Sequence, residues 1–303
     1  MQKLCLVFLV VIFALTACST RTQDLRIGII SSSINHLPLS YAIERGEIPT
    51  DKYRLIKFSS GWEVQEAMIS GSIDVAIMPF TYVWNAASKG YPISTVSFFE
   101  RETDAVIAQA EIKNVSQLNG KKIGLLRAST LDVLWQDYAA SNKIDFQGIY
   151  FRSPNEAIAA LDRKEIEAAV LYVPLVNKLL NKYSLIHWFS DEYPFHPCCD
   201  LATNTVNVNT NNKRKALDML ILDLQKAIVT MNNDPERLMA FTASTYGMTA
   251  EECREALKHT RFRMDLDVSG MEFQRRMTEI SKLSGYLERI PADYEVYQTI
   301  KKK

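Results

Sequence analysis

The chain has 303 residues, with 35 basic and 35 acidic side chains, so its formal net charge is zero. This balance argues against nucleic acid as a partner, because contacts to phosphates require a basic surface. Hydrophobic residues make up 47% of the chain, which is enough to fill the core of one large domain or of two lobes.

The start of the chain has the pattern of a targeting segment. A single charge, at Lys3, precedes a long apolar run that ends in small residues. Such a run is typical of a secretory signal peptide and is too short for a spanning helix, which needs about 20 apolar residues. Residues 15–18 (LTAC) also resemble a bacterial lipoprotein signal, which implies removal of residues 1–17 and lipidation of the Cys18 thiol. Residues 18–24 are then a polar tether, and a plain signal peptide with a chance cysteine is the alternative.

Residues 55–79 predict a compact strand, helix, strand unit. Apolar strands are expected at 55–58 and 73–77, with an amphipathic helix between them that ends at Gly71. In such a unit the carboxyl ends of the two parallel strands open on one edge of the sheet, where ligands bind in α/β proteins. The residues expected at this edge are Ser59, Ser60, Gly61, Met78 and Pro79. Hydroxyls and unpaired amides at a helix start suit a small polar or anionic ligand; ordinary sheet packing is the alternative.

A second run of strands, at 122–126, 148–152 and 166–172, repeats this order of elements. The helix after its first strand begins near Ser129, which with Asp132 approximates a capping box. Capping alone explains Ser129 and Thr130, and contact with a ligand at the same helix start is the functional alternative.

Two further residues border this second edge. Arg127 is able to pair with a carboxylate, sulfonate or phosphate, although an exposed surface arginine fits the sequence equally well. Tyr172 stands at the end of the strand at 166–172, on the expected ligand face.

The remaining segments predict how two lobes are connected. Further strands are expected at 25–30, 93–99, 105–110, 185–189 and 203–208, and helices from 37, at 80–89, 154–164, 214–231, 234–246, 249–259, 269–284 and 293–301. We expect the chain to pass between the lobes near 110–113 and again at 190–198. Lobe I then comprises residues 25–110 and 198–303, and lobe II comprises residues 111–197.

Cysteine and histidine positions favour neither a disulfide framework nor a metal site. After Cys18 the chain contains Cys198, Cys199 and Cys253. Their number is odd, so they cannot all pair within one chain. The adjacent pair cannot bond without strain. A bond from Cys253 to either remains open. The four histidines form no zinc-type ligand pair, so no metal or cofactor is expected.

Three segments resemble one protein family. Residues 58–96 resemble the solute-binding proteins of ABC importers, in the branch for nitrate, sulfonates, taurine and thiamine-precursor pyrimidines; residues 70–76 (SGSIDVA) fill the family block S-G-x-x-D-V-A. Residues 117–124 (QLNGKKIG) resemble the entry into the second lobe of that family. Residues 153–176 resemble its P-x-E-A block, with Lys164 and Glu167 in place of the usual glycine and aspartate.

The resemblance implies an α/β fold of two interleaved lobes, with mixed, mainly parallel sheets joined by a two-segment hinge. It implies a lipid-anchored, extracytoplasmic monomer that is not an enzyme and that delivers a small molecule to an ABC permease and its ATPase. The expected solute is a sulfonate, nitrate, taurine or pyrimidine bound between the lobes. By the same resemblance, the loop with Ser33, Asn35 and His36 contributes to the ligand site; exposure of His36 at a helix start is the alternative.

Two other classes of protein, enzymes and regulatory ligand-sensing domains, are alternatives to a solute-binding protein. Residues 33–39 also resemble menaquinone-pathway dehydratases, and residues 197–199 resemble cysteine-rich pyrimidine synthases. Both are cytoplasmic enzymes, which the apparent signal opposes, and no catalytic triad, metal set or phosphate loop stands out. A regulatory ligand-sensing domain lacks the helix-turn-helix that normally accompanies it.

Overall fold

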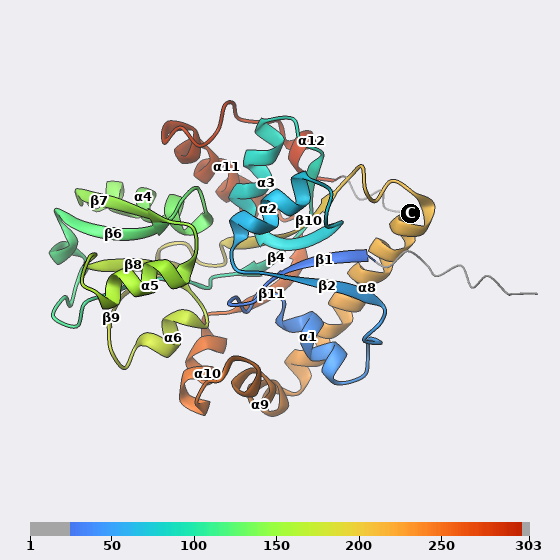
Figure 1. Cartoon of the computed structure of the whole chain (residues 1–303), viewed down its shortest axis with the longest axis horizontal. Helices are drawn as coiled ribbons and strands as arrows, with labels where there is room; N and C mark the ends of the chain where they lie inside the picture. Colours follow the sequence, from blue (N-terminus) through green and yellow to red (C-terminus); the bar gives the residue numbers. More distant parts are fainter. Residues whose placement is uncertain (1–24, 299–303) are drawn as a thin grey trace, which may run out of the picture.

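The computed structural model describes residues 25–298, which form two lobes (Figure 1). The predicted signal peptide, the tether and Cys18 lie outside the described residues, as do residues 299–303. Within the described part of the chain, no helix has the length and apolar character to cross a bilayer. The predicted fold class, two α/β lobes with mixed sheets, is confirmed. The sheets are not mainly parallel as predicted, because five of the nine strand pairings are antiparallel and four are parallel.

Lobe I is built on a six-stranded sheet in the order β11-β4-β10-β3-β1-β2. Its strands are β1 (Leu25–Ile30), β2 (Tyr53–Phe58), β3 (Val75–Pro79), β4 (Ile93–Arg101), β10 (Pro197–Asn204) and β11 (Arg261–Asp265). β1 runs parallel to β2 and β3, whereas β10 is antiparallel to both β3 and β4. The late strand β10 therefore lies between two early strands.

Lobe II is built on a five-stranded sheet in the order β7-β6-β8-β5-β9. Its strands are β5 (Asp104–Ala108), β6 (Lys121–Leu126), β7 (Phe146–Phe151), β8 (Ala168–Tyr172) and β9 (Ser184–Trp188). β6 is parallel to β7 and β8, in the same arrangement as β1 with β2 and β3. The two lobes thus repeat one parallel unit.

A glycine occupies the same place in each unit. A Cβ atom on Gly28 of β1 would lie 2.5 Å from Cδ1 of Ile73, and one on Gly124 of β6 would lie 2.6 Å from Cδ1 of Ile166. Each isoleucine precedes the third strand of its unit and packs directly over the glycine. A side chain at either position would force the isoleucine aside.

Helices cover both faces of each sheet. In lobe I, α2 (Gly61–Ile69) and α3 (Phe80–Ser88) pack on one face, and α1 (Leu37–Glu44) and α8 (Asn211–Asn233) on the other. In lobe II, η1 (Val115–Leu118) and α4 (Thr130–Ser141) pack on one face, and α5 (Pro154–Asp162) and α6 (Leu175–Leu179) on the other. The short helix α7 (Phe189–Glu192) follows β9.

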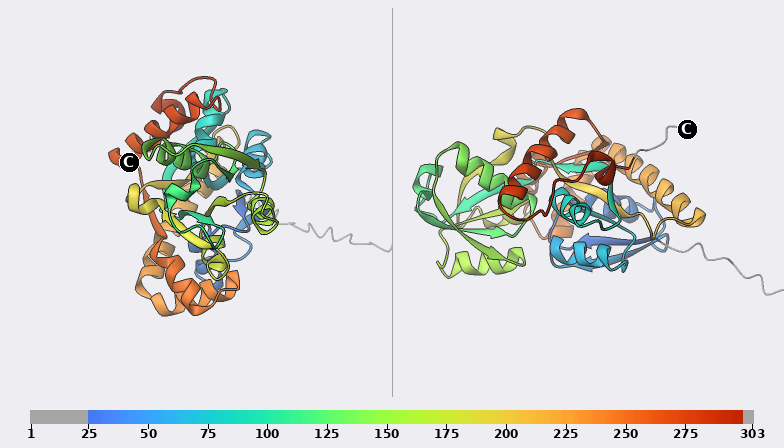
Figure 2. Two further views of the ribbon diagram at one scale, coloured as in Figure 1. Left: turned by 90° about the vertical axis from the view of Figure 1, so that its left-hand side faces the viewer. Right: turned by 90° about the horizontal axis from the view of Figure 1, so that it is seen from above.

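The C-terminal helices contact both lobes. These are α9 (Pro235–Tyr246), α10 (Ala250–Lys258), α11 (Val268–Leu283) and α12 (Asp293–Val296). α11 packs against α3 and α4, and α10 packs against α6, so α11 lies across the junction in Figure 2. The sequence assignment of residues 198–303 to lobe I is therefore incomplete, because α10 and α11 also pack on helices of lobe II.

The chain passes from lobe I to lobe II at Glu102 and Thr103, between β4 and β5. The sequence placed this crossover near 110–113 and assigned residues 25–110 to lobe I, but β5 pairs with β8 and β9 of lobe II. Its continuous apolar run fits either sheet, because both are buried on two faces. The return crossover lies at 189–196, between β9 and β10.

The two crossovers are bonded to each other. Glu102 has a left-handed backbone (φ 71°), and its amide donates to the carbonyl of His196 (3.3 Å). Its carboxylate accepts from the amide of Phe195 (2.6 Å), which is also left-handed (φ 59°). These bonds hold two non-glycine residues in a conformation that such residues seldom adopt.

At three other places the structure differs from the sequence prediction. The strand expected at 203–208 ends at Asn204, whose side-chain oxygen accepts from the amides of Val206 and Asn207 and turns the chain. β11 was not predicted, although Phe262 and Met264 alternate with charged residues in the pattern of a half-buried strand. The helix expected at 293–301 ends at Val296, after which the chain runs beside β4 through a bridge to Thr95.

Candidate functional site

A small cavity lies where the two lobes meet, at the carboxyl ends of β1, β3 and β8. Its volume is about 40 Å³, enough for a few water molecules or one compact chemical group. We call it the inner chamber. Of the residues predicted for the ligand site, those that line it are Ser33, Asn35, Ser60, Gly61, Pro79, Ser129, Thr130 and Tyr172.

The start of α2 forms one wall of the chamber. The hydroxyl of Ser60 caps the helix by accepting from the amide of Glu63 (3.3 Å), and the Glu63 carboxylate accepts from the amide of Ser59 (2.7 Å). The amides of Gly61 and Trp62 have no partner within residues 25–298. This helix start therefore offers unpaired donors and partial positive charge.

The start of α4 forms the facing wall, in lobe II. Ser129 caps the helix by accepting from the amide of Asp132 (3.4 Å), and its own hydroxyl donates to the carbonyl of Leu126 (2.6 Å). The hydroxyl of Thr130 donates across the lobes to the carbonyl of Cys198 (3.1 Å). The predicted capping role of Ser129 is confirmed, and its contact with a ligand stays a prediction.

The end of β4 and the start of β5 make the third wall acidic. Glu100 is 1% exposed, and neither carboxylate oxygen has a hydrogen-bond partner in the described chain. Burial, with a smaller effect from Asp104, raises the pKa of Glu100 to about 8. The Cys199 thiol and the Thr103 hydroxyl oppose this rise but do not reach hydrogen-bond geometry.

Asp104, the second carboxylate, is paired with a histidine. Its Oδ2 lies 3.2 Å from Nε2 of His196, and both side chains are fully buried. Nδ1 of His196 lies 2.7 Å from the carbonyl of Tyr193 and so must carry a proton that it donates. Asp104 therefore already has a hydrogen-bond partner in His196.

Two adjacent thiols complete this wall. Cys198 donates to Oδ1 of Asp104 (3.4 Å), and Cys199 donates to the sulfur of Cys198 (3.8 Å). Donor atoms of Glu100, Cys198 and Cys199 all lie within 4.8 Å of one another. The sequence analysis missed this three-donor cluster, because Glu100 is distant in sequence from the cysteines. Cys198, Cys199 and Cys253 are all free and buried.

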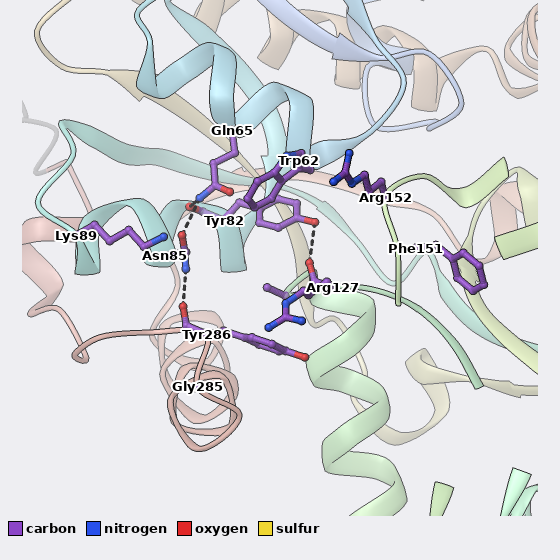
Figure 3. A pocket seen from close by; sticks show the side chains of 11 residues that line it. Trp62, Gln65, Tyr82, Asn85, Lys89, Arg127, Phe151, Arg152, Gly285 and Tyr286 are labelled. Carbon is purple, nitrogen blue, oxygen red and sulfur yellow. Dashed lines mark hydrogen bonds between the residues drawn. The ribbon is translucent and has the colours of Figure 1, made fainter. Parts of the chain in front are cut away.

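A larger pocket of about 450 Å³ opens outside the chamber, and Tyr82 lines both. We call it the outer pocket (Figure 3). The hydroxyl of Tyr82 in lobe I donates to the carbonyl of Arg127 in lobe II (3.2 Å). The guanidinium of Arg127 lies over the ring of Tyr286, 5.5 Å from the ring centre. It also lies 5.6 Å from the centre of the Tyr150 ring. With Lys89 and Arg152, Arg127 makes this pocket basic.

Four predicted residues lie away from the inner chamber. Arg127 lines the outer pocket, Ser59 is exposed, and Met78 is part of the hydrophobic core. His36 is buried rather than exposed at its helix start, and burial, together with the positive charge of Lys57, lowers its pKa to about 4. It is therefore a neutral side chain beside Asn35.

The acidic wall was missed by the sequence analysis, although a signal for it exists. Residues 100–104 (ERETD) carry four charges between two apolar strands. Such a cluster, at a place where a sheet should be buried, marks a functional site.

The two α/β lobes with mixed sheets have the fold of periplasmic binding proteins, and comparison with known structures agrees. The chain aligns with an alkanesulfonate-binding protein, SsuA, from Xanthomonas axonopodis pv. citri with a TM-score of 0.79 and 16% identity, covering 91% of this chain and 98% of that one. It aligns with the nitrate-binding protein NrtA from Synechocystis PCC 6803 with a TM-score of 0.72 and 13% identity, covering 88% and 82%. At these identities the likeness shows the fold.

Residues 35–238 match the NMT1/THI5-like family, and the chain belongs to that family. Among curated proteins, one of Brucella abortus, named only as a candidate binding protein, is 30% identical over 127 residues. That match covers 40% of this chain and 39% of the relative, so it spans about two fifths of either protein.

Proposed function

We propose that this protein is the solute-binding component of an ABC importer and that it holds a small polar or anionic molecule between the lobes, with a polar group of that molecule in the inner chamber. The observation that carries the proposal is that both lobes line the chamber at two helix starts, those of α2 and α4. Sulfonates, nitrate, taurine and pyrimidine-type molecules are the classes to test. The binding proteins among its structural neighbours support this function over an enzymatic one.

Hydrogen bonds between the lobes support a mechanism of closure around the solute. Besides the bond from Tyr82, the hydroxyls of Ser32 and Tyr172 lie 2.7 Å apart across the junction, and Thr130 binds the carbonyl of Cys198. A solute that contacts both lobes does so only in the closed form and shifts the population toward it. The bonded crossovers at Glu102 and Phe195 are the proposed hinge.

We further propose that Cys18 carries a lipid and anchors the protein on the extracytoplasmic side of a membrane. In that position it acts as a monomer and delivers its solute to a permease and an ATPase subunit. The apolar run before Cys18 and the small residues next to it support this.

Thermal-shift screening of residues 19–303 tests the proposal. The panel contains sulfonates, nitrate, pyrimidines and amino acids, because a solute that binds only the folded state raises the melting temperature. X-ray scattering with the best compound should show a smaller radius of gyration. Absence of any stabilising compound, or an unchanged radius at saturation, would contradict the proposal.

A further inference from the structure

Glu100 is a buried acidic group that the fold itself leaves without a partner. Both of its oxygens lack hydrogen bonds within residues 25–298, although 99% of the side chain is removed from solvent. Burial of an unpaired carboxylate is unfavourable, and native structures pair such groups with few exceptions. The chamber that Glu100 lines is therefore where its partner belongs.

No basic side chain of the chamber balances this carboxylate. The lining residues include no lysine, arginine or histidine, and the basic residues of the outer pocket lie beyond Tyr82. Asp104 already has a partner, since its Oδ2 lies 3.2 Å from Nε2 of His196. Glu100 is thus the acidic group of the chamber that has no counter-charge.

Donors face Glu100 from the other walls. The amides of Gly61, Thr130 and Leu131 stand at the starts of α2 and α4, and none has a partner in the described chain. A molecule in the chamber meets acceptors at β4 and donors at the helix starts.

We propose that the solute presents a cationic N–H donor group, of the ammonium or amidinium type, to Glu100 and places its acceptor atoms against the starts of α2 and α4. This assignment rests on the proposed function, which makes the chamber the solute site. It narrows the solute from polar or anionic molecules in general to small amines that also carry acceptor atoms.

A thiophilic metal ion is the competing occupant, because Glu100, Cys198 and Cys199 offer three donors within 4.8 Å. The thiol protons argue against it. Cys198 donates to Asp104, Cys199 donates to Cys198, and burial raises the pKa of Cys199 to about 12. A metal ion requires thiolates, which this environment disfavours.

The proposal carries a pH dependence, because burial raises the pKa of Glu100 to about 8 and so keeps it protonated near neutral pH before a solute binds. The other titratable groups that face Glu100 are Asp104 with its partner His196, Cys198, Cys199, Tyr172 and Tyr246. Burial raises the pKa of both tyrosines, and the neighbouring thiol together with burial raises that of Cys198. Affinity for a cation should therefore rise about tenfold per pH unit from about pH 6 to pH 8, with release of a proton from Glu100.

Titration calorimetry with matched pairs of probes tests the proposal. The pairs are taurine with isethionate, and β-alanine with 3-hydroxypropanoate. The members of a pair differ only in the nitrogen group. We expect at least one nitrogen-bearing member to bind about tenfold to a hundredfold more tightly than its partner, as a hydrogen bond to a charged group allows.

Two variants test whether the effect on binding is specific to Glu100 or common to buried carboxyl groups. Glu100→Gln keeps the size of the side chain and should abolish both the preference within a pair and the pH slope. Asp200→Asn is the matched control, because Asp200 is also fully buried but is hydrogen-bonded to Thr95 and Gln274 outside the chamber. It should keep the preference and the slope. If Glu100→Gln does not fold, the wild type is titrated in buffers of different ionisation enthalpy, which measures the protons released on binding. Release of a proton supports the assignment to Glu100, and its absence contradicts it.

The outcomes distinguish the two levels of the argument. Equal binding within every pair, or a screening hit without an N–H group, overturns the assignment to Glu100 and leaves the proposed function intact. Tight binding of Zn²⁺ that Cys199→Ser abolishes also overturns it, in favour of a metal ion. Failure of all probes and of the whole screening panel overturns the proposed function itself.

Discussion

Replacing Glu100 by glutamine should change how the free energy of unfolding depends on pH. Burial raises the pKa of Glu100 to about 8 in the folded protein, against 4.5 as the ordinary value of the side chain. The folded state therefore holds a proton that the unfolded state has lost. Glu100 therefore does not lower the free energy of unfolding below about pH 4.5. As the pH rises from there toward 8, the free energy of unfolding falls.

Each pH unit within this interval lowers the free energy of unfolding by about 1.4 kcal/mol for one such group. The upper part of the interval is the clearest, because the buried His36, with a pKa lowered to about 4, affects stability only below about pH 6.5. Between about pH 6.5 and pH 8, the wild type should lose about 2 kcal/mol through Glu100. The glutamine variant should lose none through this position.

Urea denaturation of solute-free protein, followed by tryptophan fluorescence, measures this difference. Asp200→Asn is the control, since burial raises the pKa of Asp200 only to about 7. Its stability curve should separate from that of the wild type below about pH 7 and run parallel above it. Parallel curves for wild type and Glu100→Gln from about pH 6.5 to pH 8 would refute the account of Glu100 as a protonated buried acid.

Three further predictions concern caps, closure and anchoring. Ser60→Ala and Ser129→Ala should each cost about 1 kcal/mol in stability and about tenfold in solute affinity, whereas Ser153→Ala, the cap of α5, should cost stability alone in paired denaturation and titration experiments. Tyr82→Phe removes a bond between the lobes and should enlarge the radius of gyration in X-ray scattering without solute; an unchanged radius would show that this bond does not hold the lobes closed. Cys18→Ser should release the protein from membranes with loss of the lipid mass, and unchanged fractionation would exclude the anchor.

The parts of the fold that depend on local patterns could be predicted from the sequence. The unit from β2 to β3 was expected because its strands are apolar, its helix is amphipathic, and the small polar residues 59–61 stand between the first strand and the helix. The same reasoning located the start of α4 at Ser129. These features need only neighbours in the chain, so their prediction does not require the tertiary structure.

The acidic wall depends on contacts that sequence patterns do not reveal. Glu100 and Asp104 meet Cys198 and Cys199 only because β10 inserts between β3 and β4, and 94 residues separate Asp104 from Cys198. Thr130 was identified because it follows a strand directly at the edge of a sheet. Glu100 was not identified, because it lies on β4, two places from β3 in the sheet. The position of the first crossover was wrong for a similar reason, since pairing of β5 with β8 is non-local.

The insertion of β10 also sets the order in which the lobes are able to fold. All five strands of lobe II lie within residues 104–188, one continuous segment, so its sheet can assemble from neighbouring elements alone. In lobe I, β4 pairs only with β10 and β11 among the described strands, and it has no sheet partner until the chain reaches residue 197. Closing so long a loop is slow, because its entropy is lost before the contacts form. When the chain folds, lobe II is therefore able to complete its sheet from residues 104–188 alone, whereas β4 gains a sheet partner only when a strand about a hundred residues further along the chain reaches it.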